Sequence, residues 1–122
     1  MKVSDLKLSK HFAIKADDKV SKISAKFGHY RSVFVLYGKK PVGIITPVDL
    51  VKKVIMKNKD PKKVLAKQIM SKPVKTASLD DDPKKISALM TKKGYLTMPV
   101  VDKKKNIVGV ITVYDLMNKK SK

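Results

Sequence analysis

The sequence predicts an α/β fold of the α+β kind, in which two β-α-β-β-α repeats pack about a pseudo-twofold axis. Residues 42 to 50 read Val-Gly-Ile-Ile-Thr-Pro-Val-Asp-Leu, and 66 positions later residues 108 to 116 read Val-Gly-Val-Ile-Thr-Val-Tyr-Asp-Leu. Repetition at so long a period indicates two copies of one supersecondary unit, neither of which buries its apolar face alone. We therefore expect any special chemistry to lie between the copies.

The repetition extends upstream of these motifs. Lys22-Ile23-Ser24-Ala25 returns 63 positions later as Lys85-Ile86-Ser87-Ala88, whereas Gly28 and Gly94 are 66 positions apart. The three residues 91 to 93 thus have no counterpart in the first copy, and its first helix is expected to be about one turn shorter. The predicted organisation is a first repeat at 1–57, a connecting helix or linker at 58–70 and a second repeat at 71–122.

Each copy is predicted to begin with an extended segment (12–16 and 74–78) and a helix. Apolar residues recur at helical spacing in both helices, namely Val20, Ile23 and Phe27 in the first and Ile86, Leu89 and Met90 in the second. Gly28 and Gly94 are expected to end them. Two apolar strands follow in each copy, 33–37 with 41–45 and 98–102 with 107–111, and their connections are short enough for hairpins.

Three helix starts share a polar cap followed by proline, which suits the first helical position. They are Thr46-Pro47, Asp60-Pro61 and Asp82-Pro83. The first opens the second helix of copy one, as Thr112 does in copy two, and the third opens the long helix of copy two. Asp60-Pro61 predicts a connecting helix that carries Val64, Leu65 and Ile69.

This doubled order, closed in each copy by Gly-h-h-Thr-x-x-Asp-Leu, resembles a tandem pair of CBS domains, the Bateman module. Pro99-Val100-Val101-Asp102 before the second closing motif strengthens the resemblance, and Val33 to Leu36 is its more degraded counterpart. The resemblance covers essentially the whole chain. It implies a stand-alone regulatory module that binds adenine nucleotides or related adenosyl compounds.

The charge balance leaves a second function open. Ten acidic residues, all Asp, stand against 29 basic ones, of which Arg31 is the one arginine, so the net charge is +19. Such a chain attracts polyanions, and a nucleic-acid-binding protein is the alternative interpretation. The basic residues are spread over both copies, and no RNP-like aromatic pair, Gly-x-x-Gly loop or zinc-ligand spacing is present. The alternative is therefore ranked second.

Enzymatic function is not expected. His11 and His29 are the only histidines, and without Cys or Glu they form no recognisable zinc or acid-base site. The run Asp80 to Asp82 is interpreted as a helix N-terminal cluster rather than a cation site. The absence of cysteine, of a long apolar run and of a signal-peptide pattern predicts a cytoplasmic protein.

The two Thr-x-x-Asp motifs have two interpretations. Thr46 with Asp49, and Thr112 with Asp115, can each form a capping box that needs no ligand. The same geometry presents free amides, a hydroxyl and a carboxylate at one spot, which can hold a ribose diol and a phosphate. In proteins that resemble this one, the Thr and Asp of the motif hold the ribose and phosphate of adenosyl ligands.

The resemblance also implies two clefts, each built from both copies. The first would join Thr46 and Asp49 with Thr76, Ala77, Ser78, Thr97 and Met98. The second would join Thr112 and Asp115 with Ile14, Lys15, Ala16, Arg31 and Ser32. Arg31 lies two positions before Val33, the counterpart of Pro99, where family members often carry a phosphate-binding Arg or His. Its planar guanidinium suits phosphate.

We therefore expect a regulatory binding module in which a nucleotide favours one arrangement of the copies and a partner reads that arrangement. No output domain lies within these 122 residues, so a separate regulated protein or the module's own oligomer is expected to receive the signal. The resemblance implies a homodimer with helices at its interface. No cofactor or metal is expected besides the regulatory ligand. A module with empty clefts that only dimerises is a third, weaker alternative.

Overall fold

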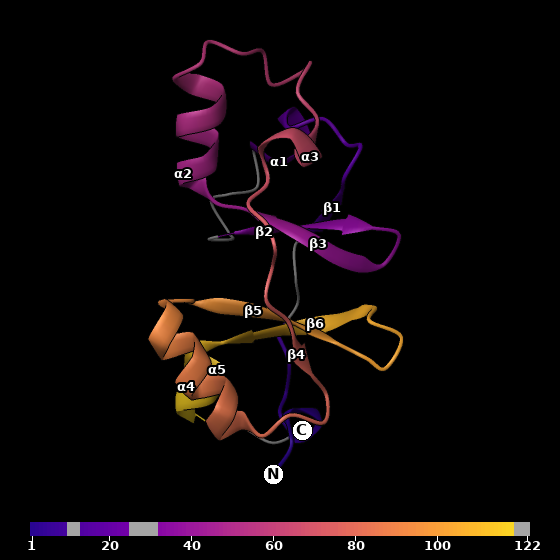
Figure 1. Cartoon of the computed structure of the whole chain (residues 1–122), viewed down its shortest axis with the longest axis vertical. Coiled ribbons are helices and arrows are strands. Elements are labelled where there is room, and N and C mark those ends of the chain that lie inside the picture. Colours follow the sequence, from indigo (N-terminus) through magenta and orange to yellow (C-terminus); the bar gives the residue numbers. More distant parts are fainter. Residues whose placement is uncertain (10–12, 25–31, 119–122) are drawn as a thin grey trace. The chain divides into compact units, whose positions relative to one another are not determined.

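A computed structural model describes residues 1–9, 13–24 and 32–118, and the chain divides into two compact units (Figure 1). The first-repeat unit is Phe12–Val74, and the second-repeat unit combines Met1–His11 with Lys75–Lys122. The start of the chain thus belongs to the unit of the second repeat. Within the described ranges, no helix is both long and apolar enough to cross a membrane.

The first-repeat unit has a three-stranded sheet in the order β1-β2-β3. Strand β1 is parallel to β2, and β2 and β3 form the expected antiparallel hairpin. In Figure 1 the helices cover one face of this sheet. Ile23 of α1, Ile69 of α3 and Val20, which precedes α1, belong to one buried core with Val35 and Ile45 of the strands. The elements are β1 Ala13–Lys15, α1 Ser21–Ser24, β2 Val33–Tyr37, β3 Lys40–Ile45, α2 Pro47–Leu50, the π-helical η2 Val51–Ile55 and α3 Ala66–Ile69.

The second-repeat unit has the same plan, with a sheet in the order β4-β5-β6 and helices α4 and α5 packed on one face of it (Figure 1). Its core includes Val3 and Leu6 from the start of the chain, together with Met98 and Ile111 of the hairpin. The elements are η1 Val3–Asp5, β4 Ala77–Ser78, α4 Pro83–Lys93, β5 Thr97–Val101, β6 Ile107–Thr112 and α5 Val113–Asn118.

Most of the expected elements are present, which confirms the predicted fold class. Both hairpins form, and Gly94 ends α4 in the left-handed conformation with φ +71°. Asp82 caps α4 by accepting from Lys84 N at 2.9 Å. The predicted end of the first helix at Gly28 lies outside the described residues.

The prediction of a connecting helix from Asp60-Pro61 is wrong. Asp60 Oδ1 accepts from Lys62 N at 2.9 Å, and residues 61–63 form a turn. The helix begins only at Ala66, where the Gln68 side chain accepts from Leu65 N at 2.8 Å. An Asp side chain that bonds the backbone two residues on closes a turn as readily as it caps a helix, so the pattern alone did not separate the two.

Each sheet carries an additional bridge from the segment that leads into the opposite repeat. Ser9 pairs with Val110 of β6, and Ser71 pairs with Ile44 of β3. The residue before each serine covers a glycine: a Cβ on Gly109 would lie 2.9 Å from Leu8 Cβ, and one on Gly43 would lie 2.9 Å from Met70 Cβ. The glycine of each Gly-h-h-Thr-x-x-Asp motif is therefore required by the close approach of this leading segment.

Candidate functional site

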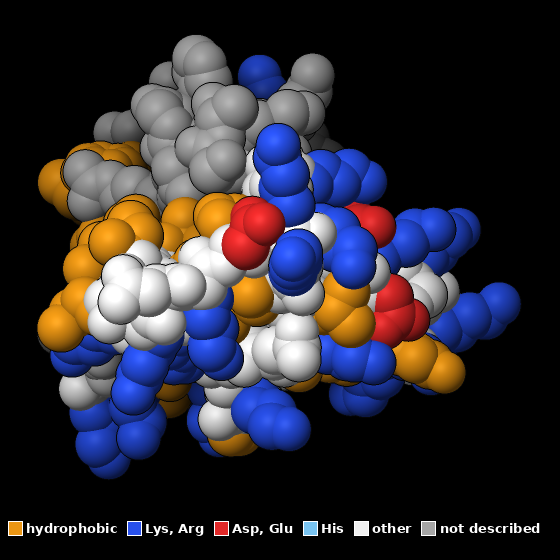
Figure 2. All heavy atoms as spheres, turned by 90° about the horizontal axis from the view of Figure 1, so that it is seen from above, with side chains coloured by type: hydrophobic (Ala, Val, Ile, Leu, Met, Phe, Trp, Pro, Cys, Tyr) orange, Lys and Arg blue, Asp and Glu red, His pale blue; other side chains and the backbone are white. Residues whose placement is uncertain are grey.

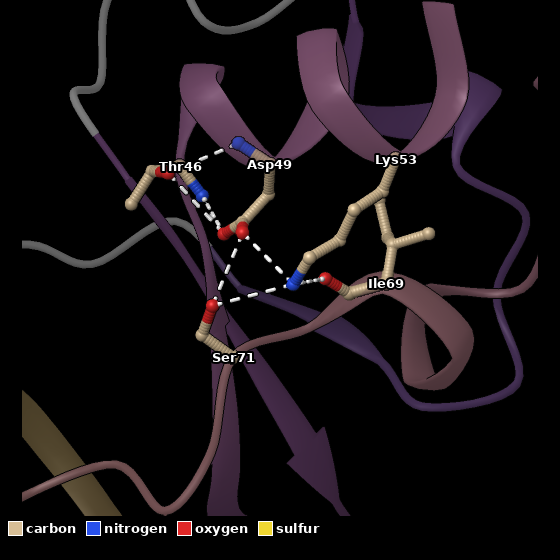
Figure 3. Close-up of polar contacts among 5 residues, drawn as sticks. All are labelled: Thr46, Asp49, Lys53, Ile69 and Ser71. Carbon is tan, nitrogen blue, oxygen red and sulfur yellow. Dashed lines mark hydrogen bonds and ion pairs between the residues drawn. The ribbon is translucent and has the colours of Figure 1, made fainter. Parts of the chain in front are cut away.

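Thr46 and Asp49 form a capping box at the start of α2 (Figure 3). Asp49 Oδ2 accepts from Thr46 N at 2.9 Å, and Thr46 Oγ1 accepts from Asp49 N at 3.3 Å. The Thr46 hydroxyl lies 3.2 Å from the same carboxylate oxygen. These bonds arise because the chain leaves β3 and enters a helix, where amides lack partners.

The other oxygen of Asp49 is also occupied. Lys53, one helical turn on, places Nζ 3.0 Å from Asp49 Oδ1, and Ser71 Oγ donates to that atom at 3.1 Å. Lys53 Nζ also donates to Ile69 O at 3.0 Å, so the network joins α2, η2 and the segment after α3 (Figure 3). Asp49 is 7% exposed, and it is the one buried polar or charged residue among those described.

This environment keeps Asp49 ionised. Burial by itself would raise the pKa of the Asp49 carboxyl, but the hydrogen bonds from Thr46 N, Lys53 and Ser71 and the charge of Lys53 outweigh it and hold the pKa below the ordinary value of 3.8. The carboxylate is therefore charged near neutral pH, with partners on both oxygens.

Thr112 and Asp115 form the equivalent box at the start of α5. Asp115 Oδ2 accepts from Thr112 N at 2.9 Å, and Thr112 Oγ1 accepts from Asp115 N at 3.1 Å. The same Oδ2 accepts from Ser9 Oγ at 3.0 Å. Among the described residues, Asp115 has no ion pair and its Oδ1 accepts no hydrogen bond; Lys119, which holds the position of Lys53 in this copy, lies outside them.

Sequence reasoning missed the two serines. Leu8-Ser9-Lys10 and Met70-Ser71-Lys72 are 62 positions apart and stand shortly before the predicted extended segments 12–16 and 74–78, which is a signal that the sequence contained. The predicted extended segments begin only at residues 12 and 74, so neither serine lies within them. Each serine bonds the carboxylate of the opposite repeat, which a comparison of equivalent segments does not indicate.

The other predicted site residues divide between the two units. Ile14, Lys15, Ala16 and Ser32 belong to the unit of Asp49, and Thr76, Ala77, Ser78, Thr97 and Met98 belong to the unit of Asp115. Within its unit, Thr97 pairs directly with Thr112 across the hairpin. Each predicted cleft draws residues from both units. Arg31 lies outside the described residues.

Burial decides how the strand residues can act. The side chains of Ile14, Ala16, Ala77 and Met98 are at most 9% exposed and lie in the hydrophobic core of their own unit. Any ligand contact that these residues make must pass through their backbone. Lys15 and Thr76 are exposed, and Ser32, Ser78 and Thr97 are half-buried.

The acidic run before α4 has structural partners. Asp82 caps the helix, Asp81 Oδ2 accepts from Ser78 N at 2.8 Å, and Asp80 lies 3.7 Å from Lys2 Nζ. In the part of the chain that the structure describes, no three His, Cys, Asp or Glu residues gather as a metal site. The interpretation of this run as a helix N-terminal cluster therefore agrees with its contacts.

Lysine side chains cover much of the surface. Figure 2 shows them scattered over one face among few acidic groups, while apolar side chains gather at its left edge. Within the described ranges four ion pairs form, so most lysines have no acidic partner there. The scattered lysines attract anions in general. On the face shown in Figure 2 they do not line a single groove.

Comparison with known proteins gives a family match over nearly the whole chain. The model of the CBS domain family matches residues 3–55 and 66–122. An uncharacterized protein of Methanopyrus kandleri is 40% identical over 78 residues, which are 64% of this chain and 40% of that protein. The chain therefore spans less than half the length of this curated relative.

Solved structures share the fold. A CBS domain protein of unknown function from Thermoplasma acidophilum matches with a TM-score of 0.78 and 25% identity, over 100% of this chain and 70% of that one. The cytosolic domain of the Mg²⁺ channel MgtE in complex with ATP matches with a TM-score of 0.75 and 20% identity, over 89% of this chain and 44% of that one.

Proposed function

Because this chain belongs to the CBS domain family and carries two of its domains, we propose that it is a regulatory module that binds an adenine nucleotide or a related adenosyl compound. The candidates are AMP, ADP, ATP, S-adenosylmethionine and methylthioadenosine. A ligand held by both repeats would favour one relative arrangement of them, and a partner would read that arrangement.

The observation that carries this proposal is the state of Asp115. Its carboxylate is held at a helix start through Oδ2, while Oδ1 accepts no hydrogen bond from the described residues. A fixed carboxylate whose second oxygen meets no donor in the described part of the chain suits a ribose hydroxyl, and the amides at the same helix start favour a phosphate. We therefore propose Thr112 and Asp115 as the principal site.

Thr46 and Asp49 are proposed as the weaker site. Both oxygens of Asp49 have partners, and a ribose hydroxyl would have to displace Lys53 or Ser71 to reach Oδ1. Removing one partner of a partly buried ion pair leaves a charge that must be compensated. The cost of that exchange opposes binding at this motif.

We propose that each site is shared by the repeats, and the length of chain between them is compatible with this proposal. Ser9, which bonds Asp115, lies five positions before Ile14, and Ser71, which bonds Asp49, lies five positions before Thr76. An extended chain covers at most about 3.6 Å per residue, so about 18 Å is the longest span in either case. A short segment of chain thus joins the serine that bonds each carboxylate to the proposed cleft partners of that carboxylate. We propose that Arg31 and Lys15 add positive charge at the Asp115 site for a ligand phosphate.

Titration calorimetry with AMP, ATP, S-adenosylmethionine and adenosine tests the proposal. We expect saturable binding by at least one compound, and a ligand at 100 times its dissociation constant should stabilise the fold by about 2.7 kcal/mol. Asp115→Asn should weaken binding at least tenfold, and Asp49→Asn should weaken it less. If no compound binds the folded chain, the sensing proposal is wrong.

A phosphate contact at this site is tested with Arg31→Ala. The variant should weaken AMP by about tenfold or more relative to adenosine, since a charge-assisted bond contributes about 1.5 to 3 kcal/mol. Lys2→Ala, a change at an exposed basic residue near the start of the chain, is the control for overall charge. Equal losses for AMP and adenosine would show that Arg31 does not serve a phosphate.

We also propose that the module pairs with a second copy of itself through its helices. Val48, Val51 and Ile55 follow one another at helical spacing on α2 and η2 and are 58%, 46% and 65% exposed, and Met117 of α5 is 78% exposed. Exposed apolar stripes of this kind mark interaction surfaces. Ile55→Lys should shift the chain from dimer to monomer in sedimentation velocity, whereas a dimer that persists would contradict this surface.

Nucleic acid remains the second candidate because the described lysines outnumber their acidic partners. Binding that reflects only the net charge of +19 should fall steeply with added salt and show no preference among sequences. Sequence-selective binding to a duplex that survives at about 0.15 M salt would promote this function above ligand sensing.

A further inference from the structure

We propose that Ser9 is a positioning residue of the Asp115 site, so that the segment leading into the first repeat completes the site of the second. The proposal rests on the proposed function, because it takes Asp115 as the carboxylate that receives the ligand. Neither the Thr-x-x-Asp motif nor the predicted clefts include this serine. Its role follows from three features of the described residues.

The first feature is the geometry at Asp115 Oδ2. This oxygen accepts from Thr112 N at 2.9 Å and from Ser9 Oγ at 3.0 Å. The terminal torsion of an Asp side chain has a broad energy minimum, so a carboxylate with the cap bond alone can turn about it. A second donor at the same oxygen restricts that rotation and keeps Oδ1 directed away from both donors. Preorganised groups bind a ligand with less ordering cost.

The second feature is the firm attachment of the segment that carries Ser9. Val3 and Leu6 are 0% and 1% exposed in the core of the second-repeat unit. Ser9 N donates to Val110 O at 2.9 Å, and Val110 N donates to Ser9 O at 3.1 Å. Leu8 packs on Gly109, where no side chain stands in its way. The hydroxyl is therefore placed by backbone pairing and core packing.

The third feature is that a serine of the equivalent segment also meets the carboxylate of the first copy, although on the oxygen that the cap bond does not use. Ser71 Oγ donates to Asp49 Oδ1 at 3.1 Å, its backbone pairs with Ile44, and Met70 packs on Gly43. The two serines thus come from equivalent segments and meet equivalent carboxylates. In the first copy Lys53 also holds the carboxylate at 3.0 Å, so Ser71 is one of two side chains on that oxygen. Ser9 has no such companion among the described residues.

Calorimetry on four variants, with AMP and adenosine as probes, tests the assignment. Ser9→Ala should weaken both probes five- to tenfold, which corresponds to one lost hydrogen bond of about 1 kcal/mol or slightly more. Ser9→Thr keeps the hydroxyl and should restore the affinity to within about threefold of the starting protein. Ser71→Ala is the matched control and should change the affinity by less than about twofold, because Lys53 still holds Asp49.

The outcomes separate a positioning role from a structural one. If Ser9→Ala melts before it can be titrated, Ser9→Cys keeps the size with a weak donor and should show the same five- to tenfold loss. Unchanged affinity in the Ser9 variants, while the starting protein binds, overturns the positioning role and leaves the proposed function intact. Equal losses in the Ser9 and Ser71 variants overturn the assignment to the Asp115 site. A starting protein that is folded and binds neither probe nor any other adenosyl compound overturns both proposals.

Discussion

The two copies carry the same Thr-x-x-Asp motif, and they leave its carboxylate in different states. Asp49 is 7% exposed and meets Thr46, Lys53 and Ser71. Asp115 is half-buried, and among the described residues it meets Thr112 and Ser9 through a single side-chain oxygen. The capping box is common to both, since it depends on residues within the motif. The availability of the carboxylate depends on residues that come from elsewhere in the chain.

The largest expected effect concerns what the copies share, the close approach of the leading segments to β3 and β6. Gly43→Val and Gly109→Val should each lower the free energy of unfolding by about 3 kcal/mol, because the new side chain occupies the space of Met70 or Leu8. Urea denaturation measures this.

Val108→Thr is the control for these glycine variants, because Val108 is 44% exposed on the same strand as Gly109. It should change stability by no more than about 0.5 kcal/mol. A large loss in one copy and none in the other would contradict the equivalence of the two segments.

The second prediction compares the carboxylates directly. Asp49→Asn should lower the free energy of unfolding by about 2 kcal/mol, because it removes the charge that Lys53 and Ser71 surround. Asp115→Asn should cost about 1 kcal/mol or less, since asparagine retains most of the helix cap. Thermal and urea unfolding of both variants measure the difference. If Asp115→Asn lowers the free energy of unfolding more than Asp49→Asn does, Asp115 contributes more to stability than Asp49.

The third prediction concerns pH. The depressed pKa of Asp49 means that its stabilising contribution is complete above the ordinary value of 3.8 and is lost as the pH falls through the depressed value. The stability difference between the starting protein and Asp49→Asn should therefore shrink as the pH falls from about 5 toward 2. Urea titrations at several pH values measure it. A difference that stays constant over this range would mean that Asp49 is not held by charge.

The smallest expected effect belongs to Lys53. Lys53→Met should lower stability by about 0.5 to 1 kcal/mol, because the Lys53 side chain is 41% exposed and its ion pair is partly screened. It should also strengthen ligand binding at Asp49, since Oδ1 then keeps only Ser71. Lys119→Met is the matched change in the other copy. A second bound ligand in the Lys53 variant, detected by calorimetric stoichiometry, would show that Lys53 prevents ligand binding at Asp49. Unchanged stoichiometry would contradict this role of Lys53.

Local patterns were sufficient for much of the fold. The repeat predicted both hairpins, and the Thr46-Pro47 and Asp82-Pro83 pairs predicted helix starts that the structure confirms. These features depend on residues a few positions apart, where backbone preferences and capping act without distant contacts. Asp60-Pro61 has the same local signature but closes a turn, and the chain then passes through the buried Val64 and the extended Leu65 before α3 begins at Ala66.

The doubled plan, the family resemblance and the four residues of the two capping boxes could all be predicted from the amino-acid sequence. The folded structure was needed to show that Ser9 and Ser71 donate to the carboxylates of the opposite repeats, and that Lys53 forms an ion pair with Asp49. It also placed the side chains of Ile14, Ala77 and Met98 in the cores of their units. The hydrogen bonds of a capping box join residues three positions apart, so a local pattern predicts them. The other donors to each carboxylate include residues from distant segments, and these come close only when the chain folds.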